Sequence, residues 1–129
     1  MAHPNEDAIR KAHAAFAAGD LETLRACFAP EVTWHAPGRH PLAGDHRGPD
    51  AVIRFITGMG QRTGGTLRIE IHDVLANDEH VVLLARVHGE RGERALHDNH
   101  ALIFHLRDGL ITECWGHPRD QHALDELLG

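Results

Sequence analysis

The sequence predicts an α+β fold in which a curved antiparallel sheet packs against helices, and two patterns lead to this prediction. Apolar residues recur mainly at helical spacing in the first half of the chain, whereas residues 66–117 form successive segments in which apolar and polar residues alternate. Tight-turn residues separate these segments, so consecutive strands are expected to pair as a meander. Such a sheet buries one face against the helices, and a cavity can open between the two layers.

Composition favours a single domain over residues 1–129. The chain has 129 residues, 42% of them hydrophobic, which suits one core. A formal net charge of -6 with interspersed signs provides no basic face, so no nucleic-acid partner is expected. No apolar run approaches the roughly 20 residues that span a bilayer, and residues 1–16 lack the apolar segment of a signal peptide. We therefore expect no membrane partner and a cytoplasmic location.

Two cysteines and 13 histidines raise the questions of disulfides and metals. Cys27 and Cys114 fit small buried side chains in a reducing compartment better than a disulfide framework. No His-x-His pair places two imidazoles on one strand face. Metal coordination stays open only for the loop histidines His35, His40 and His46, because the sequence does not show which other ligands lie near them. We predict no metal and no cofactor.

Two short helices are expected to open the chain. Asn5 is expected to cap the first helix, and Gly19 to end it. Asp20 then starts a second helix, which Pro30 stops. The buried stripe of the first helix is predicted to consist of Ile9, Ala12, His13 and Phe16.

A short strand and a long loop come next. Residues 32–35 read as a strand on which Trp34 and His35 point to opposite faces, so only one of them should face a cavity. Residues 36–49 hold three prolines and three glycines and are expected to be largely irregular, as functional loops often are. Pro49 suits the first turn of a third helix. Its apolar stripe is expected to consist of Val52, Phe55, Ile56 and Met59.

Four longer strands and a terminal helix complete the chain, with strands expected over 66–76, 80–88, 97–106 and 110–117. Asp108-Gly109 is a hairpin signal, because both residues tolerate the positive φ of a short turn. The run from Val81 to Ala85 is apolar at successive positions, as if both faces of the strand were covered, which suggests a subunit interface. Pro118 and Asp120 open the last helix. Its inner face is predicted to consist of Ala123, Leu124, Leu127 and Leu128.

The two last strands suggest a site for chemistry. Alternation puts His100 and Phe104 on one face of residues 97–106, together with Asp98, Leu102 and Leu106. Trp115 and His117 share one face of residues 110–117, and we expect that face to lie beside His100 and Phe104. A surface with imidazoles and aromatic rings, with a carboxylate at its rim, is a candidate acid/base site.

The order of elements and four motifs resemble the SnoaL-like branch of the NTF2-like superfamily. The motifs are FAPEVTWHAPG (28–38), LAGDHRG (42–48), HDVLANDEHVV (72–82) and FHLRDGLITECW (104–115). The resemblance covers nearly the whole chain. It implies a cone-shaped α+β barrel with a deep pocket among the first strand, the third helix and the last strands. It also implies a homodimer packed through the sheet.

The same cone hosts several chemistries, and the residues narrow them. Ketosteroid isomerases use a tyrosine and two aspartates, but this chain has no tyrosine, and Ala36 and Leu102 fall near the two acid positions. Limonene-type epoxide hydrolases need an Asp-Arg-Asp array and a tyrosine, which are also missing. Polyketide cyclases of the SnoaL type need one acid/base and a shaped pocket. Asp120 roughly matches their aspartate, and His100 or His117 can supply the second proton site.

The resulting hypothesis is a cofactor-independent isomerase, cyclase or lyase acting on a hydrophobic, polyketide-like carbonyl compound, with Asp120 and His100 as acid/base residues. The predicted pocket residues are Trp34, His35, Phe55, Met59, Phe104, Trp115 and His117. The residues also allow structural roles: Asp120 as a helix cap, His100 as a hydrogen-bonded interior histidine and the aromatic rings as core. The alternatives are a pocket protein that binds a small apolar ligand without catalysis, and a dimerising domain with a filled core.

Overall fold

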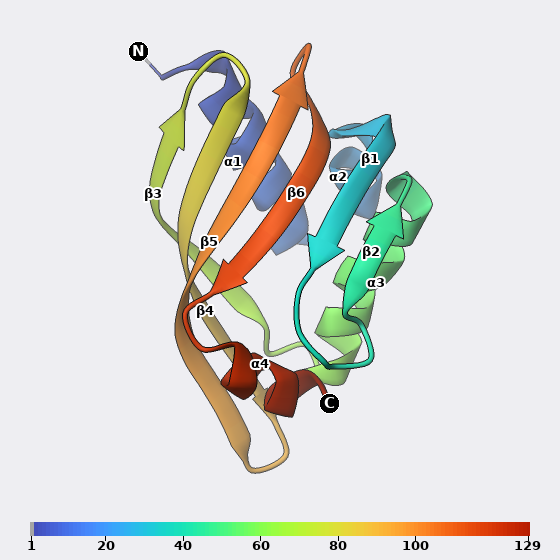
Figure 1. Cartoon of the computed structure of the whole chain (residues 1–129), viewed down its shortest axis with the longest axis vertical. Coiled ribbons are helices and arrows are strands. Elements are labelled where there is room, and N and C mark those ends of the chain that lie inside the picture. Colours follow the sequence, from blue (N-terminus) through green and yellow to red (C-terminus); the bar gives the residue numbers. More distant parts are fainter. Residues whose placement is uncertain (1) are drawn as a thin grey trace.

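The computed structural model describes residues 2–129, so Met1, the first residue of the expected domain, lies outside the described residues. Figure 1 shows a curved sheet with α1, α2 and α3 behind it and α4 across its lower end. The α+β prediction is confirmed. The elements in order are α1 (Pro4–Ala18), α2 (Leu21–Ala26), β1 (Phe28–Ala36), β2 (Gly44–Arg47), α3 (Pro49–Arg62), β3 (Arg68–Ala76), β4 (His80–Arg91), β5 (Arg94–Arg107), β6 (Leu110–Pro118) and α4 (Gln121–Leu128).

The six strands form one sheet in the order β2-β1-β6-β5-β4-β3. Strands β3 to β6 pair antiparallel with their chain neighbours, which confirms the predicted meander. β1 joins the open side of β6 in parallel, and β2 pairs antiparallel with β1. The predicted hairpin is also confirmed, because Asp108 and Gly109 both have positive φ, at 54° and 78°.

A β-bulge interrupts the pairing of β5 with β6. His105 pairs with Glu113, whereas the next residue of β5, Leu106, pairs with Ile111. Thr112 is therefore the extra residue of β6. A bulge of this kind adds one residue to one strand and bends it, and every following side chain moves to the opposite face.

The bulge overturns the face predicted for two site residues. Beyond it, Cys114 pairs with Phe104 and is buried, so the inward positions of β6 are Cys114 and Gly116. Trp115 and His117 point to the outer face of the sheet instead. The prediction that Trp115 and His117 lie beside His100 was wrong, because uninterrupted alternation was assumed through the hairpin.

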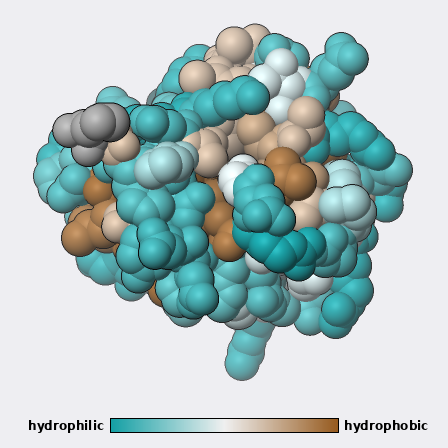
Figure 2. Space-filling model, turned by 90° about the horizontal axis from the view of Figure 1, so that it is seen from above, coloured by the Kyte–Doolittle hydropathy of each residue, from teal (hydrophilic) through white to brown (hydrophobic). Residues whose placement is uncertain are grey.

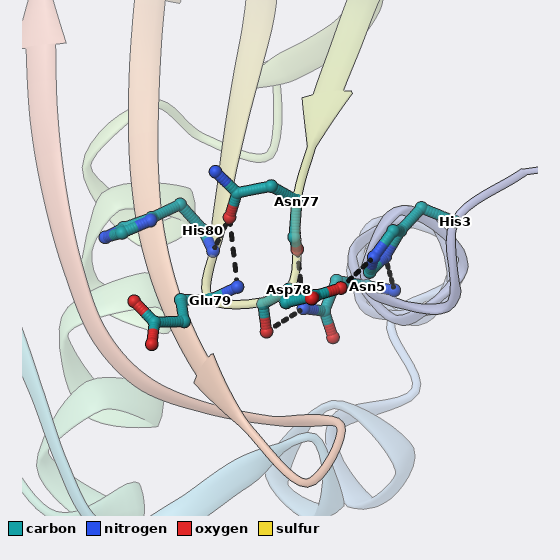
Figure 3. A network of polar contacts seen from close by, with 6 residues as sticks. All are labelled: His3, Asn5, Asn77, Asp78, Glu79 and His80. Carbon is teal, nitrogen blue, oxygen red and sulfur yellow. Dashed lines mark hydrogen bonds and ion pairs between the residues drawn. The ribbon is translucent and has the colours of Figure 1, made fainter.

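The N-terminus of α1 is tied to the turn between β3 and β4 (Figure 3). His3, not Asn5, is the cap residue of α1: its Nδ1 accepts a hydrogen bond of 3.0 Å from the Asn5 amide. The Asn5 side chain donates instead to the carbonyls of Asn77 and Asp78, at 3.0 and 3.1 Å. The predicted Asn5 cap was wrong, because a buried amide found partners far away in the sequence. The predicted end of α1 at Gly19 is confirmed.

The region around β1 and β2 contains more strand than predicted. α2 ends at Ala26, before Pro30, and β1 begins directly afterwards at Phe28. Pro30 lies within β1, where the pairing with β6 shifts between Phe28 and Thr33 and a backbone donor is not needed. Residues 36–49 were expected to be irregular, but 44–47 form β2. The start of α3 at Pro49 is confirmed.

The core lies between the concave sheet face and α1, α3 and α4. On β4 the inward side chains Val81, Leu83, Ala85 and Val87 are buried. Both cysteines, Cys27 and Cys114, are free and buried, and burial raises the pKa of each thiol. Among residues 2–129, no helix is long and apolar enough to cross a membrane. Figure 2 shows a mainly hydrophilic surface at the N-terminal end, with apolar residues in separate patches.

His35 joins three strands on the outer face. Its Nδ1 lies 2.7 Å from Asp45 on β2, and its Nε2 lies 2.6 Å from Glu113 on β6. A carboxylate oxygen accepts hydrogen bonds, so a carboxylate at each ring nitrogen favours the doubly protonated, cationic ring. The hydrogen bond to Glu113 chiefly raises the pKa of His35, against a smaller opposing effect of burial, and Asp45 adds to the increase.

We predict that His35→Gln destabilises the fold in a pH-dependent way. Because the folded-state pKa is raised, the ion pairs stabilise the fold fully below about pH 6.5, provided the carboxylates are ionised, and are lost as pH rises through the folded-state pKa. The loss in unfolding free energy should be about 1 kcal/mol at pH 6 and smaller at pH 9. Urea unfolding at both pH values measures it. His97→Gln, at an exposed outer-face histidine, is the control, and an equal loss for His35→Gln at both pH values would contradict the assignment.

Candidate active site

A cavity of about 140 Å³ lies between the concave face of the sheet and the helices. Its walls come from α1, β1, α3, the inner strands and α4, and they are predominantly apolar. The aromatic and larger aliphatic wall residues include Phe16, Trp34, Phe55, Met59, Leu102 and Phe104. The ring of Trp34 packs between those of Phe55, at 5.8 Å, and Phe104, at 6.0 Å. These contacts hold the wall in place.

Two of the three histidines that line the cavity are bound to the backbone. His13 Nε2 on α1 donates to the Ile69 carbonyl at 2.6 Å. His40, in the loop before β2, is buried, and its Nδ1 accepts from the Leu42 amide at 3.1 Å. Burial lowers the pKa of His40, which favours the neutral ring. These contacts give both residues a role in holding α1 and the loop.

His100 is the third histidine and differs from the other two. It lies on β5, its side chain is only 10% exposed, and its Nε2 is buried without a hydrogen-bond partner among the described residues. Asp98 Oδ2 lies 3.4 Å from Nε2. Asp98 and His100 are two residues apart on one strand, so both side chains point inward.

Asp98 is a buried carboxylate with several donors. Its side chain is 1% exposed. It accepts hydrogen bonds from Arg119 Nε at 3.0 Å and from the Asp120 amide at 2.9 Å. Burial alone raises the pKa of Asp98, but the amides of Asp120 and Asn99, with His100 and Arg119 close by, outweigh it, so the pKa lies below its usual value. Asp98 therefore stays ionised at neutral pH.

The charges of Asp98 and His100 favour one arrangement of protons on the pair. Burial lowers the pKa of His100, and the Asp98 carboxylate opposes this shift only in part. The ring is therefore neutral at pH 7. A carboxylate beside Nε2 favours the tautomer with hydrogen on Nε2, as in other carboxylate–histidine pairs. The free nitrogen, Nδ1, then has an unprotonated lone pair and can act as a base.

The structure separates the predicted site residues into two groups. Five of them line the cavity: Trp34, Phe55, Met59, His100 and Phe104. Three lie on the outer face, where the ring of Trp115 stacks on that of His35 at 5.1 Å and His117 is exposed. Asp120 is absent from the cavity wall. Its carboxylate accepts from the Ala123 amide at 3.0 Å and caps α4, the structural role that the sequence also allowed.

Sequence reasoning missed three residues of the site. Asp98 was placed on the inner face with His100 but was given no role, although a carboxylate two residues from a histidine on one strand face was the available signal. His13 was placed in the buried stripe of its helix. His40 was considered only as a metal ligand, and its place on the cavity wall had no signal, because the path of a loop does not follow from its composition. Among residues 2–129, no cluster of three or more His, Cys, Asp or Glu side chains could hold a metal.

Comparisons with known proteins agree with this fold. The family model described as a SnoaL-like domain matches residues 9–114. The uncharacterized protein Rv0034 of Mycobacterium tuberculosis is 37% identical over 107 residues, 82% of each chain. The structure of Bal32a, from a soil-derived mobile gene cassette, has a TM-score of 0.93 and 33% identity over 98% of this chain and 97% of that one.

A more distant structure shares only the fold. IdmH, a putative polyketide cyclase from Streptomyces antibioticus, has a TM-score of 0.77 and 23% identity, with 97% of this chain and 99% of that chain covered. The residues that the SnoaL-like family model matches extend from α1 to the middle of β6. They include all of β5, with Asp98 and His100. This chain is therefore a member of the SnoaL-like domain family, within the NTF2-like fold.

Proposed function

We propose that this protein is a cofactor-independent isomerase or cyclase that moves a proton on a small carbonyl compound, with His100 as the acid/base residue. The observation that carries the proposal is the nearly buried His100 on the wall of an apolar cavity, 3.4 Å from the ionised Asp98. Members of the same fold family include a putative polyketide cyclase, which supports proton chemistry on carbonyl compounds in such a pocket. The proposed location is the cytoplasm, whose reducing conditions suit the two free thiols.

The proposed proton transfer needs no co-reactant. Nδ1 of neutral His100 takes a proton from the carbon next to the substrate carbonyl, and the C–H electron pair forms an enolate. The resulting imidazolium is stabilised by Asp98. The imidazolium then returns the proton to another carbon of the conjugated system, which completes an isomerisation. The indole N–H of Trp34, on the cavity wall, is our candidate donor to the enolate oxygen.

Asp98 acts through His100 in this proposal and is a positioning residue. Its carboxylate favours the proton on Nε2 and offsets the positive charge that His100 gains. Asp120 contributes its backbone amide to Asp98 but keeps its own carboxylate on the helix cap. The acid/base role considered for Asp120 is therefore assigned to His100.

We predict that His100→Leu abolishes most of the activity. The assay is conversion of a β,γ-unsaturated cyclohexenone to its conjugated isomer, followed by ultraviolet absorbance, because one ring suits the cavity. Loss of a general base lowers kcat by about 10²- to 10⁴-fold. His97→Leu, an outer-face histidine on the same strand, is the matched control and should keep the wild-type rate. Asp120→Asn should also keep it, because asparagine caps a helix as well as aspartate.

Two results would decide against this proposal. If a folded His100→Leu protein kept the wild-type rate, or if Asp120→Asn lost activity at an unchanged melting temperature, the catalytic assignment would be wrong. Binding of the enone without acceleration by the wild-type protein would instead favour the non-catalytic ligand-binding alternative. The cavity itself argues against the alternative of a domain with a filled core.

We also propose that two copies pack through the outer face of the sheet. Val82 pairs with Ile103 and Leu84 pairs with Ala101, so these apolar side chains lie together on that face. Leu75, paired with Val82, is 53% exposed. Covering this patch would bury apolar area that the single chain leaves partly exposed.

We predict that Ile103→Lys converts a dimer into a monomer. In a dimer, each of the two subunits would bury one unpaired lysine charge in the interface, which is unfavourable. Light scattering coupled to size-exclusion chromatography measures the mass. Gln61→Lys, at an exposed position of α3, adds the same charge away from the patch and should leave the dimer intact. A wild-type protein that is monomeric at the concentrations tested would contradict the dimer.

A further inference from the structure

The size of the cavity limits its ligand to about one ring. Its volume is about 140 Å³. A dry apolar cavity of about 150 Å³, lined by leucine, isoleucine and phenylalanine, binds benzene in another protein. Pockets for drug-sized molecules have about 300–1,000 Å³. A fused multi-ring polyketide therefore exceeds this cavity, whereas a single six-membered ring fits.

The protonation state of His100 determines which polar group that ring should carry. The neutral ring with its hydrogen on Nε2 offers a hydrogen-bond acceptor at Nδ1. His13 and His40 each have one ring nitrogen engaged with the backbone, whereas His100 Nε2 is buried without a hydrogen-bond partner among the described residues, 3.4 Å from Asp98. A ligand that donates a hydrogen bond would engage Nδ1, the ring nitrogen that does not face Asp98.

The charges around the cavity favour a neutral ligand. Asp98 is ionised and lies directly behind His100, so an anionic ligand at Nδ1 would be repelled. Arg119, the nearby cation, is 66% exposed and is engaged with Asp98 outside the cavity wall. The apolar walls offer a cationic ligand no further carboxylate. A neutral hydroxyl group carries neither of these charges and can still donate a hydrogen bond to Nδ1.

We propose that the cavity selects a compact, neutral single-ring compound bearing a hydroxyl group, a phenol or an enol, whose O–H donates to His100 Nδ1. This inference rests on the proposed function, because it assigns the ligand to the same cavity and to the same nitrogen of His100. It goes further by fixing the size, the charge and the hydrogen-bonding direction of the ligand.

The test compares three single-ring probes by calorimetric titration at pH 7. Phenol has the ring and the donor, anisole replaces the donor with a methoxy group, and benzene has neither. We expect phenol to bind at least about fivefold more tightly than anisole or benzene, the value of one net neutral hydrogen bond. Naphthol, with the same donor on two rings, should bind more weakly than phenol. No preference for phenol over anisole would overturn the proposal.

Variants of the protein test whether the preference for phenol depends on His100 and on the cavity. In His100→Leu, phenol should lose its advantage while benzene still binds, and in His97→Leu the wild-type preference should persist. Leu102→Trp, which fills the cavity, should abolish binding of all three probes. Because this variant can fail to fold, Met59→Trp serves as a second filled variant on another wall, and a phenol preference retained in a folded filled variant would overturn the proposal.

Binding and turnover separate this inference from the proposed function. A His100-dependent preference for phenol without enone isomerisation would support the ligand class and contradict the catalytic proposal. Enone isomerisation without a phenol preference would support the catalytic proposal and contradict the ligand class. Failure of every probe to bind the wild-type protein would overturn the ligand class.

Discussion

The extra residue at Thr112 is the structural constraint on which the cavity depends. In an uninterrupted ladder, Glu113 and Trp115 would point toward the helices, and the indole ring and a carboxylate would fill the space beside β5. The bulge turns Cys114 and Gly116 inward instead, and these small side chains leave room next to Leu102 and His100. A second bulge, at His72 in β3, shifts that strand relative to β4. Bulges bend strands and increase local twist, which is consistent with the curved sheet in Figure 1.

The buried charge of Asp98 connects this cavity to the rest of the molecule. Burying a carboxylate is unfavourable unless hydrogen bonds and a counter-charge offset it. Arg119 and the Asp120 amide provide them from the turn between β6 and α4. The same carboxylate therefore anchors the start of α4 and sets the proton position on His100. Loss of the Asp98 carboxylate would therefore affect both the stability of the fold and the proposed chemistry.

Elements with strong local signals could be predicted from the sequence. The apolar stripes of α1 and α3, the proline at the start of α3 and the Asp108-Gly109 turn depend on residues close together in the chain, and each was placed correctly. The strand β2 was missed because its four residues, Gly44–Arg47, show no apolar alternation. Its pairing partner, β1, supplies its stability.

The candidate site was predicted only in part, because local alternation could be read from the sequence whereas a bulge and tertiary contacts could not. His100 and Phe104 were assigned to one common face, and both line the cavity, because alternation holds within an uninterrupted stretch of strand. Trp115 and His117 were not, since one bulged residue reverses the face and has no compositional signature. Asp120 was close to the site along the chain, but its carboxylate caps α4. Tertiary contacts decided between its two roles.

The central claim is that His100 is neutral, with its hydrogen on Nε2 facing Asp98 and a free lone pair on Nδ1. Long-range ¹H–¹⁵N NMR correlation spectra of the histidine side chains report the tautomer and its titration directly. The account predicts that His100 shows a protonated Nε2 and an unprotonated Nδ1 at pH 7, with a pKa below about 6.5. A hydrogen on Nδ1, or a ring still charged at pH 7, would contradict the account.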